Sequence, residues 1–148
     1  MPKYLLIVDF RPGVDDTPIE RWTEDEVAAH LDHYRALNEE LVASGELVGA
    51  DVLSPPDLSV VVTADGIGAP VVTDGPFAEF KEWVAGYQIV DVPDRARAVE
   101  IAARVSAVPG RGGRPLQQPV QVRRIMTEDA PDDVEEMRAY AQQAGSAG

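Results

Sequence analysis

Residues 23–44 carry the start signal, the periodicity and the stop signal of a long α-helix. Thr23 stands three residues before Glu26, the spacing of a capping box, in which each side chain accepts a hydrogen bond from the other residue's backbone N–H. Gly45 stands where a residue of left-handed conformation commonly ends a helix. The apolar residues between these signals recur every three or four positions and predict one buried face: Val27, Leu31, Tyr34, Leu37 and Leu41. The fold must therefore give this helix a surface to pack against.

Short runs rich in β-branched and aromatic residues lie on both sides of this helix and predict strands. They span residues 3–9, 46–53, 58–63, 69–73, 85–92 and 120–126. The turn sequence ADGIG separates the third run from the fourth, which predicts a hairpin. Pro93 and Asp94 open a second helix that extends to Val105. Its expected inward face consists of Ala98, Val99, Ala102 and Val105.

The order of these elements predicts an α+β domain. A βαββαβ chain with right-handed crossovers forms a ferredoxin-like sheet with both helices on one face, and here a hairpin is inserted. The strands carry apolar residues on both sides: Leu5, Leu6 and Ile7; Val60, Val61 and Val62; Ile89 and Val90. Because helices cover only one face, we expect a second copy to cover the other, giving a homodimer.

Residues 127–148 differ in composition from the rest of the chain, with six acidic residues and one arginine. We therefore expect a domain of residues 1–126 and an acidic C-terminal tail of residues 127–148. Helical spacing in the tail predicts a short helix, capped near Asp132, whose apolar stripe packs on the body or the partner: Val134, Met137, Tyr140 and Ala141. Its acids would face a basic group: Arg111, Arg114, Arg123 and Arg124. The alternative is a disordered acidic extension.

Composition excludes several functional classes. The 148 residues include no cysteine, which excludes disulfides, thiolate nucleophiles and zinc–cysteine sites. The formal net charge is −13, so we expect no direct binding of nucleic acid and none of an anionic membrane. The N-terminal apolar run is shorter than a signal-peptide core, and we expect a cytoplasmic location. The two histidines lie on different sides of a helix, so we expect no metal and no cofactor.

Residues 72–92, VTDGPFAEFKEWVAGYQIVDV, resemble the DGPF signature of the YCII-related proteins. The flanking segments agree: KYLLIV near the N-terminus, HLDHYRALNEELVASGELV in the first helix and next strand, and VQVRRIM in the last strand. The resemblance covers residues 3–126. It implies a dimeric α+β barrel of ferredoxin-like subunits and no settled reaction. A His–Asp pair is suggested as catalytic in relatives, and some relatives are linked to extracytoplasmic-function sigma factors.

The resemblance places the catalytic His–Asp pair at His30 and Asp74. On the helix, His30 falls at the edge of the apolar face, whereas His33 falls mostly in solvent. A histidine at that border fits a general base, and it equally fits a structural imidazole at a helix–sheet seam. Asp74 precedes a Gly-Pro turn, where its carboxylate either orients the imidazole or caps the turn. Phe80 replaces the hydroxyl residue of the usual signature, so any ligand contact by that hydroxyl is lost.

Five residues are candidates for substrate binding. Tyr34 and Tyr87 supply hydroxyl groups and Phe77 an aromatic ring, while Glu79 and Lys81 supply charges on an irregular segment. The alternative roles are core packing for the aromatic residues and a weak, solvated ion pair for the charged ones.

These candidates support two functions. The first is a small-molecule enzyme of proton-transfer or hydrolytic type, with His30 as the acid/base and Asp74 orienting it. The second is a non-catalytic dimer that binds a metabolite or regulates a transcription factor. The second is supported because the sequence has no cysteine nucleophile and no Gly-x-Ser-x-Gly elbow.

Overall fold

The computed structural model describes residues 1–10, 17–75 and 83–126, and residues 135, 138, 139, 141, 142 and 145 of the C-terminal tail. The strands are β1 (Lys3–Phe10), β2 (Leu47–Val52), β3 (Val60–Thr63), β4 (Val71–Asp74), β5 (Trp83–Asp91) and β6 (Val120–Arg124). The helices are α1 (Glu24–Ala43) and α2 (Arg95–Ser106), with short 3-10 turns at Ile19–Arg21, Pro56–Leu58 and Arg111–Gly113. None of the described helices is long and apolar enough to cross a membrane.

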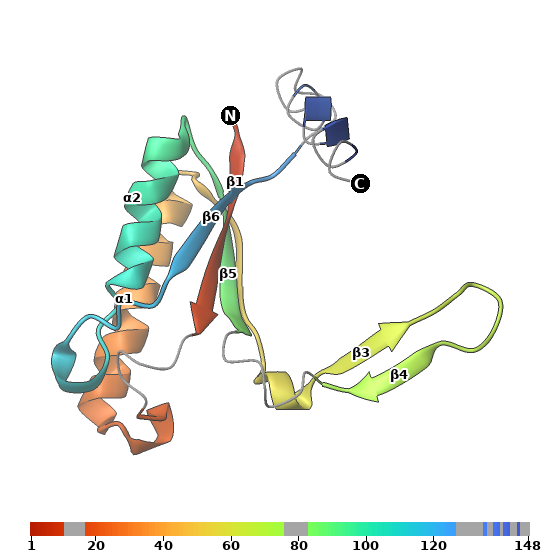
Figure 1. The fold of residues 1–148 in the computed structure, drawn as a ribbon. Helices are drawn as coiled ribbons and strands as arrows, with labels where there is room; N and C mark the ends of the chain where they lie inside the picture. The colour runs from red at the N-terminus through yellow and green to blue at the C-terminus, as the bar shows by residue number, and fades with distance from the viewer. Residues whose placement is uncertain are drawn as a thin grey trace.

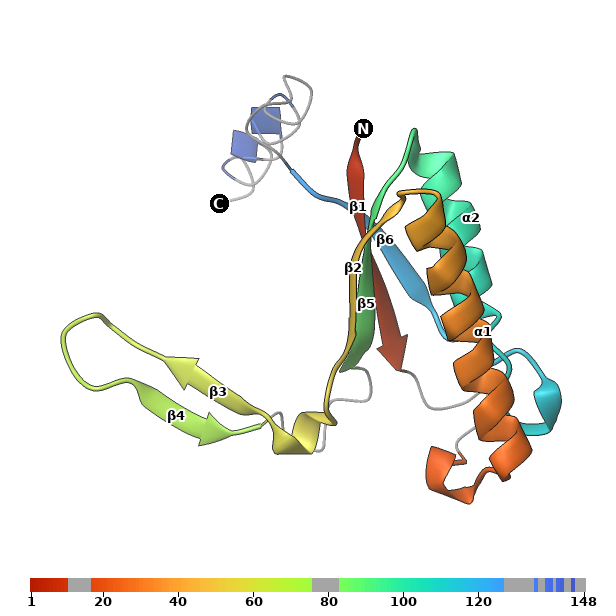
Figure 2. The same ribbon diagram turned by 180° about the vertical axis from the view of Figure 1, so that it is seen from behind.

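Four strands form the main sheet in the order β2-β5-β1-β6, and each strand is antiparallel to its neighbours. Both helices lie on the same side of this sheet (Figures 1 and 2). The predicted α+β fold with both helices on one face of the sheet is therefore confirmed, and the antiparallel strand order is consistent with a ferredoxin-like fold. The other side of the sheet, which we call the open face, carries no helix in the described part of the chain.

Helix α1 begins as predicted, with a complete capping box between Thr23 and Glu26, and the chain leaves it through Gly45 at a φ of 78°. One predicted core position is wrong, because Leu31 is 50% exposed. Leu37 and Leu41 are buried as expected, and His30 is half-buried. The inward stripe of α1 therefore passes through His30 rather than through its neighbour Leu31.

Helix α2 is capped by Asp94, whose carboxylate accepts a hydrogen bond from the backbone N–H of Arg97 at 2.9 Å. The predicted inward position Val99 is wrong, because its side chain is 47% exposed. Ile101 is fully buried in its place. The inward face follows the spacing of three and four residues given by Ala98, Ile101, Ala102 and Val105.

The core lies between the helices and the sheet. Strands β1 and β5 contribute Tyr4, Leu6 and Val90, and Val92 follows β5. The helices contribute Leu37, Leu41, Ala98, Ile101, Ala102 and Val105. Alternate residues of the same strands point to the open face, where Leu5 pairs with Ile89 and Ile7 with Tyr87.

Strands β3 and β4 form the predicted hairpin, with Val62 opposite Val72. We call residues 60–74 the arm. Within the described residues the two strands pair only with each other, and the arm projects from the main body on the side opposite the helices (Figures 1 and 2). The predicted third strand starts two residues late, because Pro56–Leu58 forms a 3-10 turn.

Most of the predicted tail helix, including Val134, Met137 and Tyr140 of its apolar stripe, lies outside the described residues. Its described positions are helical, and Ala141 is exposed. Packing of this stripe stays a prediction.

Candidate functional site at the start of α1

The beginning of α1 is held against the loop that contains the 3-10 turn Arg111–Gly113. Glu26 accepts a hydrogen bond from the backbone N–H of Gly112, in addition to its capping-box bond with Thr23. These backbone donors, that of Thr23 above all, lower the pKa of the Glu26 carboxyl from its ordinary value of 4.5. Arg111 donates to the Thr17 hydroxyl at 3.0 Å. The segment before α1 and the loop before β6 are thereby joined.

His30 points toward this loop. Its Nδ1 lies 3.0 Å from the carbonyl oxygen of Pro109. A carbonyl oxygen only accepts, so Nδ1 carries the hydrogen and Nε2 of the neutral ring is an acceptor. Burial is the main cause that lowers the pKa of His30 below its ordinary value of 6.5. The ring is therefore neutral at pH 7, with one basic nitrogen that its backbone contact does not use.

Two aromatic rings flank the imidazole of His30. The Trp22 ring centroid is 5.4 Å away at an interplanar angle of 74°, and that of Tyr34 is 5.2 Å away at 67°. Burial raises the pKa of the Tyr34 hydroxyl above its ordinary value of 10, so it keeps its proton at neutral pH. We call Trp22, His30 and Tyr34 the aromatic site. It combines a hydrogen-bond acceptor, a hydroxyl group and an apolar indole ring.

Trp22 was not among the residues predicted from the sequence. Its place directly before the N-cap Thr23 is a signal that could have found it, because an apolar residue there commonly packs back on the helix.

His33 is half-buried rather than mostly in solvent, which corrects the sequence-based expectation. Its Nε2 lies 2.8 Å from the carbonyl oxygen of Arg104 in α2. The expectation failed because α2 packs beside α1 and shields that side of the helix. Both histidines therefore donate to backbone carbonyls between Arg104 and Pro109, a structural role that holds α1 in place.

Within one chain the described contacts do not bring Asp74 to His30. Asp74 is the exposed last residue of β4, opposite Val60 at the base of the arm. His30 lies in the helix layer on the other side of the main sheet (Figure 1). The described partner of His30 Nδ1 is the Pro109 carbonyl. The His–Asp pair stays a prediction.

The other predicted binding residues have different positions. Tyr87 lies in β5, where its hydroxyl donates to Asp51 at 2.7 Å, and this bond raises the pKa of Tyr87. It faces away from the helix layer, so Tyr34 alone of the two tyrosines joins His30. Phe77, Glu79 and Lys81 lie outside the described residues. Among the residues that are described, no group of three acidic or histidine side chains could hold a metal ion.

The chain shares its pattern with known proteins. The family model of the YCII-related domain matches residues 3–112. An uncharacterized protein of Rhizobium meliloti (strain 1021) is 28% identical over 106 residues, which cover 69% of this chain and 85% of that protein. The matched region of the family model contains the whole aromatic site and the Pro109 carbonyl that fixes it. The chain therefore belongs to the YCII-related domain family.

Proposed function

We propose that the protein is a cytoplasmic homodimer that binds a small molecule at the aromatic site. The observation that carries this proposal is the hydrogen bond from His30 to the Pro109 carbonyl. It orients the ring and leaves Nε2 as an acceptor beside Trp22 and Tyr34. The chemistry fits a planar ligand with a hydroxyl group, which donates to Nε2 while its ring contacts the indole.

Binding is favoured over acid/base catalysis by the group that holds the imidazole. A peptide carbonyl carries no net charge and stabilises an imidazolium less than a carboxylate does. The described contacts of His30 include no carboxylate. A regulatory partnership with a sigma factor stays a prediction from the family resemblance.

The homodimer is supported by the open face of the main sheet. Leu5 of β1 pairs with Ile89 of β5 on this side, and Ile7 pairs with Tyr87. A sheet with apolar side chains on both faces needs a cover on both, and a second copy supplies it for this face.

The binding proposal is tested with 4-nitrophenol as a probe, titrated into the dimer while tryptophan fluorescence and imidazole ¹⁵N shifts are recorded. His30→Asn keeps an amide donor at the position of Nδ1 and removes Nε2. His33→Gln keeps the donor to Arg104 and is the matched control. We expect saturable binding to the wild type and the control, and loss of binding in His30→Asn. Equal binding by His30→Asn would overturn the proposed site, as would no binding by any of a panel of hydroxylated aromatic compounds.

A small-molecule enzyme is the second candidate, because a neutral His30 can accept a proton. Its test compares hydrolysis of 4-nitrophenyl esters, lactones and dienelactone-like substrates by the wild type, His30→Asn and Asp74→Asn. A His–Asp pair predicts the same large loss in both variants. If the pair forms between two copies, mixing the variants restores part of the rate. Equal rates in all three proteins exclude this candidate.

A further inference from the structure

The arm exposes more apolar side chains than a free hairpin can support. Its valines are about half exposed, with Val62 at 55% and Val72 at 57%, and Ile67 at the tip is 94% exposed. They occupy both faces of the two-stranded ribbon, since Val62 and Val72 point to one side and Val61 and Val71 to the other. An isolated two-stranded hairpin is at best marginally stable in water. Another surface must therefore cover the arm.

The two strands of the arm are tied together at their base. Gly75 donates its backbone N–H to the Ser59 carbonyl at 2.7 Å, and the Ser59 hydroxyl donates to the Pro56 carbonyl at 2.5 Å. A Cβ atom on Gly75 would overlap the carbonyl oxygens of Pro56 and Ser59. This close packing ties both ends of the arm to the 3-10 turn Pro56–Leu58, which follows β2 of the main sheet.

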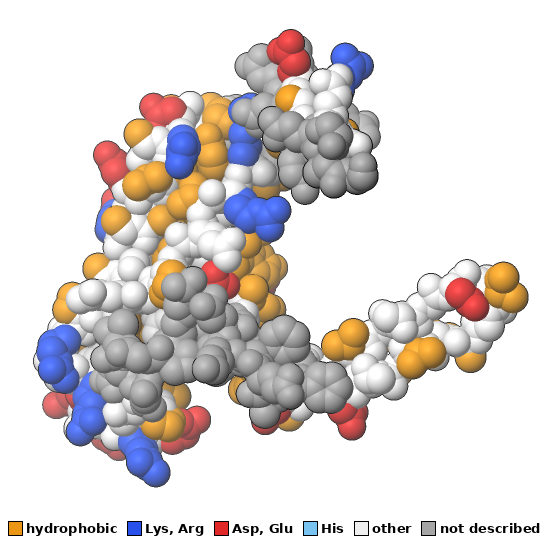
Figure 3. Space-filling model, in the orientation of Figure 1, with side chains coloured by type: hydrophobic (Ala, Val, Ile, Leu, Met, Phe, Trp, Pro, Cys, Tyr) orange, Lys and Arg blue, Asp and Glu red, His pale blue; other side chains and the backbone are white. Residues whose placement is uncertain are grey.

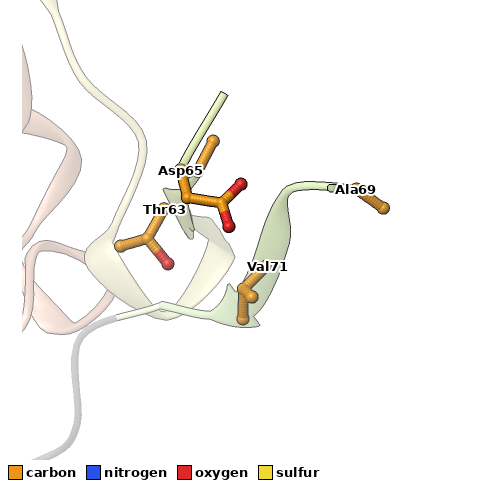
Figure 4. A pocket seen from close by; sticks show the side chains of 5 residues that line it. Thr63, Asp65, Ala69 and Val71 are labelled. Carbon is orange, nitrogen blue, oxygen red and sulfur yellow. The ribbon is translucent and has the colours of Figure 1, made fainter. Parts of the chain in front are cut away.

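The tip of the arm is shaped by its own hydrogen bonds. Asp65 accepts from the backbone N–H groups of Ile67 at 2.9 Å and Gly68 at 3.0 Å, and these bonds lower its pKa. Beside this turn lies a shallow hollow of about 320 Å³ (Figure 4), lined by Thr63, Ala64, Asp65, Ala69 and Val71. The tip therefore presents both a protruding side chain, Ile67, and a place for one from another molecule.

We propose that the arm is a dimerization clasp, and that the arm of each copy lies across the other copy. The inference rests on the proposed homodimer and names the element that closes it. The arm and the open face lie on the same side of the body, and the surface is hollowed between them (Figure 3). A two-fold axis through this hollow places each arm against the partner's body, so both apolar surfaces are covered by one symmetric interface.

The reach of the arm fits this arrangement. From Val60 to Gly66, at about 3.3 Å per residue, the arm extends about 20 Å. The four strands of a partner's sheet span about 14 Å, which is three spacings of about 4.8 Å. The arm is therefore long enough to cross the full width of the sheet.

The charges of the arm and of the far end of the sheet are complementary. Residues 56–75 contain Asp57, Asp65 and Asp74 and no lysine or arginine. The opposite end of the open face carries Lys3 on β1, the N-terminal amine and the exposed Arg123 on β6, against one acid, Asp91 of β5, which lies opposite Lys3 and contacts the amine at 3.7 Å. An antiparallel two-fold arrangement brings the acidic arm of one copy to this basic end of the other. The charges favour a second copy as the occupant.

Sedimentation equilibrium over a concentration series tests the clasp. In the first variant, residues 60–74 are deleted and Ser59 is joined to Gly75 through one added glycine, which the hydrogen bond between them allows. The second variant is Val62→Ser with Val72→Ser. Its matched control is Val42→Ser with Val99→Ser, which changes similarly exposed valines of the helix layer, at 63% and 47%. Circular dichroism verifies that each variant is folded.

We expect the wild type to be a dimer, with Kd raised about tenfold or more by the arm deletion and raised by the double arm substitution. The helix-layer control should keep the wild-type Kd, and Arg123→Glu should weaken the dimer. A deletion variant that dimerizes with an unchanged Kd would refute the clasp and leave the homodimer standing. A wild type that stays monomeric at micromolar concentration would refute both the homodimer and the clasp.

Discussion

His30 of α1 donates from Nδ1 to the carbonyl oxygen of Pro109, 79 residues further along the chain. This bond fixes the orientation of the imidazole and also ties the start of α1 to the loop after α2. Because the bond needs the hydrogen on Nδ1, it selects one tautomer of the neutral ring. The stability of the fold and the chemistry of the aromatic site therefore depend on the same group.

Stability should fall when His30 is forced to take a second proton. Its pKa in the folded protein is below the ordinary value of 6.5, so near and below that pH the unfolded chain binds more protons. The contribution of the neutral His30 ring to the free energy of unfolding is complete above pH 6.5, and it is lost as pH falls through 6.5 toward the pKa of His30 in the folded protein. Urea midpoints at pH 7.5 and 5.5 measure it. Between pH 7.5 and pH 5.5 the urea midpoint of His30→Asn should fall less than that of the wild type, whereas the midpoint of His33→Gln should fall as much. An equal fall in the wild type and His30→Asn would contradict the assignment of this loss of stability to His30.

The secondary structure was largely predictable because its signals are local. The capping box of α1 involves Thr23 and Glu26, and the cap of α2 involves Asp94 and Arg97. In each pair the two residues are only three positions apart. The errors at Leu31 and Val99 have a different cause. Which side of a helix is buried depends on how the whole helix lies on the sheet, and a small rotation of the predicted stripe leaves Leu31 or Val99 exposed.

The candidate site was only partly predictable. His30 and Tyr34 could be found because helical spacing places them on neighbouring turns. The Pro109 carbonyl could not, because it lies on an irregular loop and a backbone acceptor leaves no mark in the sequence. The exposure of the arm was also hidden, since its valine-rich strands resemble those of a buried sheet.

The ion pair between Arg97 and Glu46 should make stability acid-sensitive. Nε and Nη2 of Arg97 lie 2.8 and 2.9 Å from the two carboxylate oxygens, and this bond lowers the pKa of Glu46 to about 2. The contribution is present above pH 4.5 and is lost as pH falls from 4.5 toward 2. We expect Glu46→Gln to lower the free energy of unfolding at pH 7 by about 1–2 kcal/mol, less at pH 3.

The matched control for this pair is Glu100→Gln, because Glu100 contacts the same guanidinium at 3.1 Å from a side chain that is 66% exposed. An exposed pair of this kind contributes about 0–1 kcal/mol. Urea denaturation of both variants at pH 7 and pH 3 measures the difference. If Glu46→Gln loses no more stability than Glu100→Gln, the Arg97–Glu46 pair contributes no more to the free energy of unfolding than the exposed Arg97–Glu100 pair.

Gly75→Ala should disturb the base of the arm. The added Cβ would overlap the carbonyl oxygens of Pro56 and Ser59, so the arm must shift or the turn must open. Overpacking of this kind costs about 1–3 kcal/mol. Gly68→Ala is the control within the arm, because the nearest atom to its Cβ would be the Asp65 carboxylate at 4.0 Å. We expect a lower melting temperature and a weaker dimer for Gly75→Ala alone, and equal behaviour of the two variants would argue against a fixed base.

The acidic tail supplies the last prediction. Its apolar stripe predicts a packed helix, whereas Ala141 of that stripe is exposed in the single chain. We predict that the stripe packs on the partner, which agrees with the exposure of Ala141 in the single chain, and there its acids can meet arginines such as Arg111 and Arg114. We therefore expect removal of residues 127–148 to lower the melting temperature by about 2–8 °C, for a loss of about 1–2 kcal/mol, and to raise the dimer Kd.

Two further variants separate the contributions of the stripe and of the charges. Serine at Val134, Met137 and Tyr140 removes the apolar stripe and keeps every acid, so it should reproduce most of the effect of truncation. Asn and Gln at Asp132, Asp133, Glu135 and Glu136 keep the stripe, and their effect on Kd should disappear at high salt because exposed charges are screened there. Differential scanning calorimetry and sedimentation at low and high salt give both readouts. A truncated protein with the wild-type melting temperature and Kd would show instead that the tail is a solvated appendage.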